Sequence, residues 1–471
     1  MALHFSVPVS RNSGESLTAQ IQRFIKQEIQ RGTLHPGTRL PPSRSLAVDL
    51  EVSRSVVVEA YAQLAAEGYL EAIRGAGTRV RSHLSREAVV PVLLDEGPVP
   101  PMRWDLRPGS DNAPGLPRRE WLTAYQRALG APRPRGTTRP HLAGEPELRG
   151  ELARHLGRLR GVSATPSGVL VVGGFAQALT LLCAVLPDLG VTELAVEDPC
   201  HPGQRRFVRD NGLRVVPVPV DDEGIDVDAL AATSARAVLV TPAHQFPTGS
   251  VLSAARRDAL VRWARSVDGW IVEDDYDGGL WYDRRLPGPL ALQRLAPERV
   301  VYAGTASKVL DPGLRLGWLA APEELLHRLL HVRARHDLGT ESFTQLALAE
   351  LLRSGLFDRH LRRLSQRCAV RRRSLEDAVR IHLPGAAVRG PAAGLHASVR
   401  LPEGADEAAL VAGALRRGVL VRGGTAFGTA RNRAEPALVV GHAHLPRTGI
   451  AEALHAIGAG FSRPGPGSRR R

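Results

Sequence analysis

A proline-rich segment from His83 to Met102 divides this chain into two parts of very different length. The segment lacks the regular apolar spacing of a helix or a strand, and its prolines are typical of a linker. A chain of 471 residues also exceeds one ordinary globular domain. We therefore expect an N-terminal domain over 1–82, a linker over 83–102, a large domain over 103–463 and a basic tail over 464–471.

Composition excludes several classes of protein. A hydrophobic content of 43% argues against wholesale disorder and against a multi-span membrane protein. The apolar run 169–186 is interrupted by glycines, so it indicates a buried strand that turns into a helix. Cys183, Cys200 and Cys368 form neither a disulfide framework nor a Cys-x-x-Cys motif, and the first residues lack the features of a secretory signal. We expect a cytoplasmic protein.

Lysine is almost absent. It occurs only at Lys26 and Lys308, so 60 of the 62 basic residues are arginine. A guanidinium replaces an ammonium as a surface charge, but it cannot form an imine as an amine does. A lysine that remains in such a composition is a candidate for amine chemistry, and the count alone gives roughly even odds to the alternative that both lysines remained by chance.

The N-terminal part shows the element order of a winged helix-turn-helix. Apolar residues recur at helical spacing from Leu17 to Ile29, and glycine and proline then end the helix. A second helix begins at LPPSR, and a third begins after the turn at 51–54 and ends near Gly68. Two alternating runs, 69–73 and 78–81, flank a glycine-containing turn and predict a hairpin.

The segment 17–80 resembles the DNA-binding domain of GntR-type bacterial transcription regulators, nearly without gaps. This resemblance implies that five positions contact operator DNA: Arg44, Ser53, Arg54, Ser55 and Gly75. N-terminal residues of a recognition helix reach base edges, and arginine pairs bidentately with guanine. The alternative is that such arginines are only solvated charges. Net charge does not decide between these two interpretations, because the N-terminal part holds only +3 of the chain's +14.

The large domain contains the residue types that pyridoxal phosphate requires, namely an amine, an acid, hydrogen-bond donors and a phosphate cradle. Lys308 follows an apolar run and shares its loop with Thr305, Ser307 and Arg315, a set suited to a dianion. The sequence Gly-Phe175-Ala176 opens a helix whose amides point at the same anion. Asp274 ends the run WIVED, where a carboxylate would keep a pyridine nitrogen protonated.

The segment from about Trp104 to Phe461 resembles a fold-type-I aminotransferase, and the strings TPAHQFPTG, VEDDYD, YAGTASKVLDPGLRLGW and AAGLH resemble the aminotransferase-like domain of MocR-type regulators. The resemblance implies an α/β fold with a large, mostly parallel mixed sheet and a smaller C-terminal subdomain. It also implies that Lys308 bonds the cofactor and Asp274 pairs with the pyridinium. Tyr276 would be a neighbouring phenol, Arg315, Thr305 and Ser307 would bind the phosphate, and His244 or Gln245 would lie near the ring hydroxyl.

Two positions depart from this pattern. His201 stands where relatives usually stack a tyrosine on the ring, and Val439 stands where aminotransferases usually carry an arginine for the substrate carboxylate. Arg422, Arg431 or Arg433 are candidates to replace that arginine. We expect no metal site, because His396, His442 and His444 lack a further ligand and are better explained as core histidines.

Three functions follow from this sequence. The first is a homodimeric transcription regulator that binds operator DNA and senses an amine or amino acid through pyridoxal phosphate. In the second, pyridoxal phosphate itself is the signal. The third is an aminotransferase with an inert N-terminal extension, which the complete winged helix and the missing carboxylate arginine disfavour. The Arg-rich stretch 361–373 is expected to be a solvated or inter-subunit helix face.

Overall fold

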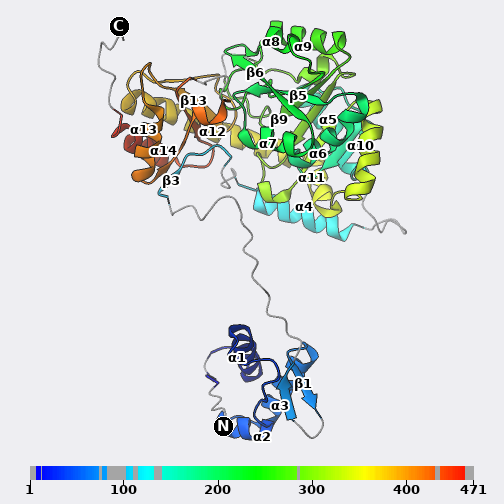
Figure 1. Ribbon diagram of the computed structural model, residues 1–471, viewed down its shortest axis with the longest axis vertical. Coiled ribbons are helices and arrows are strands. Elements are labelled where there is room, and N and C mark those ends of the chain that lie inside the picture. Colours follow the sequence, from blue (N-terminus) through cyan, green and yellow to red (C-terminus); the bar gives the residue numbers. More distant parts are fainter. Residues whose placement is uncertain are drawn as a thin grey trace. The chain divides into compact units, whose positions relative to one another are not determined.

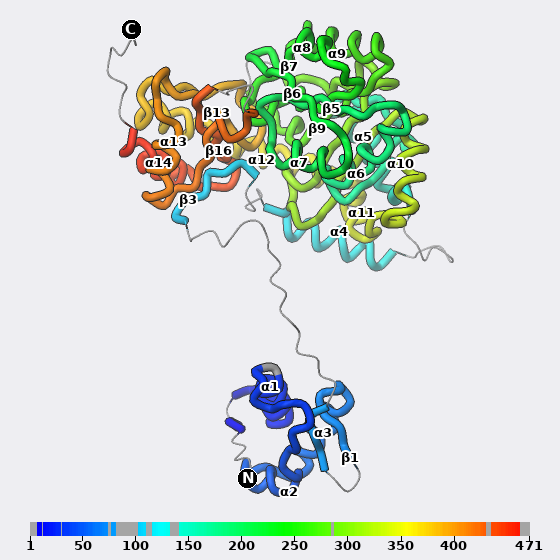
Figure 2. The backbone as a smooth tube through the Cα atoms, viewed as in Figure 1, coloured from blue at the N-terminus to red at the C-terminus, as the bar shows by residue number. Residues whose placement is uncertain are grey.

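The computed structural model describes residues 7–11, 13–73, 77–81, 102–109, 115–131, 141–283, 287–429 and 435–461. The chain divides into two compact units, Met1–Pro98 and Val99–Arg471, which are coloured along the sequence in Figures 1 and 2. The predicted linker lies almost wholly outside the described residues, as do the basic tail, the turn at 74–76 with Gly75, and the segment that holds Arg431 and Arg433.

The first unit is a three-helix domain with a hairpin, as the sequence predicts. Its elements are α1 (Leu17–Arg31), α2 (Ser43–Asp49), α3 (Arg54–Ala66), β1 (Leu70–Ile73) and β2 (Gly77–Val80). Ser16 caps α1 by accepting from the Ala19 amide, and Gly32 ends it with a φ of 78°. The helices and the hairpin bury one shared apolar core.

Lys26 has a structural role in this unit. Its ammonium forms an ion pair with Glu67 at the end of α3 and lies 5.3 Å from the centroid of the Tyr69 ring. It therefore joins α1 to the end of α3 on the surface of the unit, and neither partner is a residue that the sequence assigns to DNA.

The second unit is built on an eight-stranded sheet in the order β4-β11-β10-β9-β8-β5-β6-β7. Only β11 and β7 run antiparallel to their neighbours, so the sheet is mixed and mostly parallel, as predicted. The strands are β4 (Val169–Val172), β5 (Glu193–Asp198), β6 (Arg214–Asp221), β7 (Gly224–Ile225), β8 (Ala237–Val240), β9 (Trp270–Asp275), β10 (Val300–Thr305) and β11 (Gly317–Ala320).

Helices cover both faces of this sheet because alternate strand residues point to opposite sides. Leu170 and Val172 pack toward α6, α7 and α10, whereas Val169 and Val171 pack toward α5, α11 and α12. Farther along the sheet, α8 and α9 bury a further cluster. The helices are α4 (Arg118–Gly130), α5 (Pro146–Arg160), α6 (Phe175–Val185), α7 (Pro202–Asp210), α8 (Val227–Ala231), α9 (Ala254–Ser266), α10 (Glu323–His336), α11 (Ser342–Arg353), α12 (Leu356–His382), α13 (Glu407–Arg416) and α14 (Arg447–Gly458).

A smaller C-terminal subdomain lies beside the large sheet, and α12 connects the two parts (Figure 1). Its antiparallel sheet has the order β12-β13-β16-β15, and α13 and α14 pack on it with the end of α12. A separate parallel pair joins β14 to β3, a strand from the beginning of the unit. The strands are β3 (Trp104–Asp105), β12 (Ala387–Val388), β13 (His396–Arg400), β14 (Val419–Leu420), β15 (Arg422–Gly423) and β16 (Ala437–Gly441).

The apolar run 169–186 forms the buried strand β4 and the helix α6, as predicted. In the part of the chain that the structure describes, we find no helix long and apolar enough to cross a membrane.

Candidate functional site

The parallel strands place the predicted site residues around one cavity. Strands β4, β8, β9 and β10 run in the same direction, so their carboxyl ends and the loops that follow meet at one edge of the sheet. A cavity of about 330 Å³ opens there. Nine of the eleven predicted cofactor residues line it: Phe175, Ala176, His201, Asp274, Tyr276, Thr305, Ser307, Lys308 and Arg315.

One end of the cavity forms a cradle for an anion. Helix α6 begins directly after Gly174, whose φ is 100°. A Cβ atom at Gly174 would lie 3.2 Å from Nη2 of Arg315, so the guanidinium lies against the N-terminus of the helix. Thr305 and Ser307 line the same cavity, and the Ser307 amide donates to Thr305 Oγ1 at 3.1 Å. A helix N-terminus, a guanidinium and hydroxyls together favour a phosphate group.

Asp274 presents a buried acid to the cavity. It is 6% exposed, and its Oδ2 accepts from Gln204 Nε2 at 3.1 Å. Burial raises its pKa to about 7, although the bond from Gln204 and the charge of Lys308 act in the opposite direction. A cation placed beside this carboxyl would favour its ionised form. The environment of Asp274 therefore suits a protonated ring nitrogen.

Lys308 supplies the amine. It lines the cavity after β10 and is the only lysine of the second unit. The chain approaches it closely from the other side, because a Cβ atom at Gly109 would lie 3.1 Å from Nζ. Gly109 has a φ of 76°, a conformation that glycine adopts at little cost. The amine thus lies between the loop after β10 and the segment that follows β3.

Aromatic rings form another wall. His201 caps α7, with its Nδ1 accepting from the Gly203 amide at 3.1 Å, and its ring centroid lies 5.8 Å from that of Phe246. Burial lowers the pKa of His201, and the positive charge of Lys308 lowers it further. The lowered pKa favours the neutral ring, which can lie against a flat ligand.

His244 and Gln245 do not line the cavity. Gln245 Nε2 donates to Glu197 Oε2 at 3.2 Å and to the Pro199 carbonyl at 2.9 Å. His244 lies behind Tyr276, and its backbone carbonyl accepts from the Tyr276 hydroxyl at 2.8 Å. These two residues hold the wall of the cavity from behind, which the linear motif HQFPTG does not reveal.

Four of the five predicted DNA-contacting residues fall in the described part of the first unit, at the starts of α2 and α3. Arg44 is near the start of α2, and Arg54 is the first residue of α3. Both are exposed, as are Ser53 and Ser55, whose hydroxyls lie 2.8 Å apart. In the part of the chain that the structure describes, neither arginine forms an ion pair. Val58, one turn farther along α3, is 45% exposed.

Each unit matches a known family. Residues 17–80 match the bacterial regulatory proteins of the gntR family, and residues 109–457 match aminotransferase class I and II. Of the curated proteins, the HTH-type pyridoxine biosynthesis transcriptional regulator PdxR of Corynebacterium glutamicum is 36% identical over 83% of this chain and 85% of its own length. The probable rhizopine catabolism regulatory protein MocR of Rhizobium meliloti is 32% identical over 80% of this chain and 79% of its own length. The chain belongs to the MocR-type regulators of the GntR family.

Solved aminotransferases share the fold of the second unit of this MocR-type regulator. A multiple substrate aminotransferase from Thermococcus profundus aligns with a TM-score of 0.68 and 24% identity over 80% of this chain and 95% of its own. LysN, an α-aminoadipate aminotransferase from Thermus thermophilus, aligns with a TM-score of 0.63 and 28% identity over 76% of this chain and 91% of its own. It was solved as a complex with N-(5'-phosphopyridoxyl)-L-leucine.

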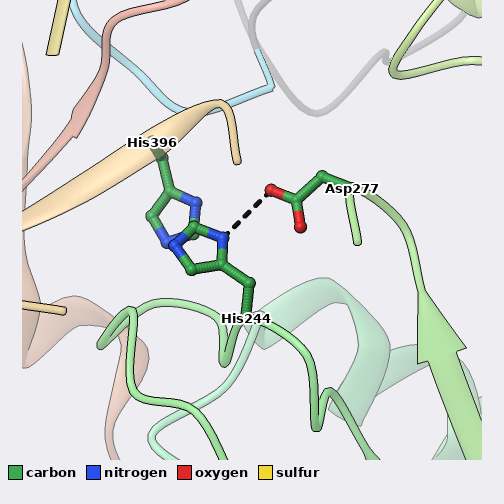
Figure 3. Close-up of side chains that lie close together, drawn as sticks. All are labelled: His244, Asp277 and His396. Atoms are coloured by element: carbon green, nitrogen blue, oxygen red, sulfur yellow. Dashed lines mark hydrogen bonds and ion pairs between the residues drawn. The ribbon is translucent and has the colours of Figure 1, made fainter. Parts of the chain in front are cut away.

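Three further side chains of the MocR-type regulator lie close together (Figure 3), and one of them, His396, also lines the cavity. His244, Asp277 and His396 are buried, and their potential ligand atoms lie within 4.8 Å of one another. The set differs from the one weighed from the sequence, because His442 Nε2 lies 2.9 Å from the Tyr282 hydroxyl and His444 Nε2 lies 2.6 Å from the Asp105 carbonyl. His244 Nδ1 lies 3.0 Å from Asp277 Oδ2, a hydrogen bond in which the ring donates to the carboxylate.

Several residues of the cavity escaped the sequence analysis. Gln204, Thr241, Phe246 and His396 line it, and Gln204 bonds Asp274 directly. Thr241 and Phe246 lie in the loop after β8, Gln204 lies in α7 and His396 begins β13, so no single sequence motif joins the four. Cys200, beside His201, has a pKa that burial raises to about 12, which disfavours a thiol nucleophile in this MocR-type regulator.

Proposed function

We propose that this chain is a homodimeric, DNA-binding transcription regulator that binds pyridoxal phosphate at Lys308 and reports the state of that site to its operator. The observation that carries the proposal is the cavity. It brings Lys308 and Arg315 of the loop after β10, the buried acid Asp274 of β9 and the start of α6 at Gly174 to one place from three segments of the chain. LysN, which shares the fold at 28% identity, was solved with a phosphopyridoxyl compound.

The residues present fit this cofactor. Lys308 would bond its carbonyl carbon, and Asp274 would face its ring nitrogen. Arg315, Thr305, Ser307 and the N-terminus of α6 would hold its phosphate, and a side chain at Gly174 would fill that cradle. When bound, pyridoxal phosphate supplies a carbonyl that exchanges between amines and a ring that withdraws electrons.

The chain's own groups prepare the site for this exchange. Burial raises the pKa of Asp274, and a cation beside it would offset this effect and favour the ionised carboxylate. The ionised carboxylate would then hold a proton on the ring nitrogen. The Tyr276 hydroxyl donates to the His244 carbonyl, and burial with nearby carboxylates raises its pKa well above the usual value, so it remains a neutral hydrogen-bonding group. His201 and Phe246 line the same cavity and offer aromatic surface to the cofactor ring.

The effector is either an amine that exchanges onto Lys308 or pyridoxal phosphate itself. Two observations favour pyridoxal phosphate. The relative with 36% identity is named for pyridoxine biosynthesis, and Val439 is 1% exposed where a substrate carboxylate would need an arginine. Arg422 pairs directly across from Val439 in the antiparallel sheet, and it is the described residue best placed to replace that arginine.

Absorption spectroscopy tests the cofactor. We expect the protein mixed with pyridoxal phosphate to show a visible band that borohydride reduction fixes, and Lys308→Ala to lack the band. Lys26→Ala is the matched control, since it removes the other lysine and leaves the cavity intact. A band that persists in Lys308→Ala and disappears in Lys26→Ala would refute the assignment.

Operator binding tests the signal. Fluorescence anisotropy with the upstream region of its own gene should change when pyridoxal phosphate is added to the wild type, and should not change in Lys308→Ala. A change that requires an amino acid in addition would identify the amine as the effector. Steady multiple turnover of amino donor and keto acid at ordinary enzyme rates would instead support the aminotransferase.

A further inference from the structure

The long helix α12 carries an unusual density of one charge. Between residues 359 and 375 it contains seven arginines and no acidic residue. Five of them, Arg359, Arg362, Arg363, Arg367 and Arg373, are exposed. We call these five the arginine face. At about 100° per residue they fall on one side of the helix, over a length of about 21 Å at 1.5 Å per residue.

These charges are mostly uncompensated. Arg363 pairs with Glu120 at 3.1 Å, and the buried Arg372 pairs with Glu376 at 2.8 Å. Within the described ranges, Arg359, Arg362, Arg367 and Arg373 form no ion pair or hydrogen bond through their side chains. Like charges four residues apart destabilise a helix by a few tenths of a kcal/mol for each pair. A helix with a purely structural role would be more stable with acidic residues at some of these positions.

A basic groove adjoins the arginine face. A cavity of about 810 Å³ runs along α12 beside the start of α4 and α14, and its charged lining consists of Glu120, Arg363, Arg367, Arg371 and Arg447. Arg447 Nε donates to Ser374 Oγ at 3.1 Å, which holds that guanidinium toward α12. Burial lowers the pKa of Arg371, and the neighbouring charge of Arg367 lowers it further, so an anion in the groove would relieve repulsion.

The distribution of charge in the whole chain points the same way. Residues 1–82, which contain the winged helix, hold +3 of the +14, so the remaining +11 lies elsewhere in the chain. Duplex DNA carries one negative charge for about every 1.7 Å of its axis. A contact from the second unit would add to the contact from the first, because both belong to one chain and share one DNA molecule.

We propose that the arginine face of α12 is a second, sequence-independent DNA contact, which binds the phosphate backbone while the winged helix reads the bases. This inference rests on the proposed DNA-binding function. Arginines that neutralise phosphates release counterions, and each such contact contributes about 0.9 to the slope of log K against log salt concentration. Backbone contacts carry no base preference, so their loss affects operator and scrambled DNA alike.

The salt dependence of DNA binding by the full chain tests this proposal. We compare wild type with Arg359→Gln/Arg362→Gln/Arg367→Gln, which leaves the pair of Arg363 with Glu120 intact. The matched control is Arg262→Gln/Arg328→Gln/Arg416→Gln, which removes three exposed arginines from α9, α10 and α13. We expect the slope of the α12 variant to fall by about two to three, equally for operator and scrambled duplex, and the control to retain the wild-type slope.

Other outcomes would overturn the proposal. An unchanged slope in the α12 variant, or an equal fall in the control, would show that the arginine face makes no specific phosphate contact. A changed oligomeric state by light scattering with an unchanged slope would make this face a subunit interface. Protection of the wild type by tripolyphosphate in a thermal melt, absent in the variant and again with an unchanged slope, would make it a small-anion site. Failure of wild type to bind any DNA would instead refute the proposed function.

Discussion

The substitution Gly174→Ala tests the anion cradle without replacing any charged side chain. Gly174 has a φ of 100°, and an added Cβ would lie 3.2, 3.4 and 3.5 Å from Nη2, Cζ and Nη1 of Arg315. The guanidinium must therefore shift, and the methyl group occupies space beside the amides at the start of α6.

Two effects of this substitution are separable. The backbone at Gly174, with φ 100° and ψ 174°, lies in a region that essentially only glycine occupies, and it costs an alanine about 1–3 kcal/mol of folding stability. Loss of one well-placed charge-assisted hydrogen bond to a phosphate costs about 1.5–3 kcal/mol, which corresponds to an affinity for pyridoxal phosphate lower by roughly 10-fold to 150-fold.

Gly212→Ala is the control, because Gly212 has a φ of 91° and an added Cβ there would meet nothing within 4 Å. Both variants should lose stability in a urea titration, whereas only Gly174→Ala should require more pyridoxal phosphate to develop the visible band. Equal affinity in Gly174→Ala and wild type, within about twofold, would refute the cradle. An equal loss in Gly212→Ala would show that general destabilisation is the cause.

Three further predictions follow from described contacts. Arg54→Ala should weaken operator binding and lower its salt slope by about 0.9 while the visible band remains; a weakened band would indicate misfolding instead. The pKa of Asp274, raised to about 7, exceeds its unfolded value of about 3.9, so the folded chain binds more protons in this window and stability falls as pH rises through it. Asp274→Asn should therefore raise the melting temperature of the cofactor-free protein at pH 8 more than at pH 4, and a uniform change would contradict the raised pKa. Arg160→Met should lower the free energy of unfolding by about 3–5 kcal/mol, because Arg160 Nε bonds Asp275 Oδ2 at 2.7 Å in the core and its loss leaves a buried carboxylate; a loss below about 1 kcal/mol would show that Asp275 finds another partner.

The sequence was most informative where chemistry depends on neighbours in the chain. Lys308, Thr305, Ser307 and Arg315 lie within eleven residues, so a single loop predicts both the amine and much of the phosphate set. The scarcity of lysine in the sequence also supported the prediction that Lys308 supplies the amine. Of the two lysines, Lys26 joins helices and Lys308 lines the cavity.

Contacts between distant segments could not be predicted. Gln204 bonds Asp274 across 70 residues, and Arg160 bonds Asp275 across 115. Both contacts require the order of strands and the packing of α5 and α7 on the sheet, which local patterns do not specify. His244 illustrates the same limit, since its motif indicates the neighbourhood of the cavity but only the fold places it behind Tyr276.

The entry of the chain into its second unit has a mechanical consequence. Strand β3 pairs with β14, and the Leu106 amide then donates to the Leu420 carbonyl at 2.7 Å, while the Leu106 carbonyl accepts from the Gly441 amide at 2.7 Å. Three residues later Gly109 lies against Lys308. A ligand that pushes Gly109 away from the lysine therefore strains a short, doubly anchored tether rather than a free loop. The same tether bears any force applied to the chain from its N-terminal side, so occupancy of the cavity and tension on the backbone act on one set of hydrogen bonds.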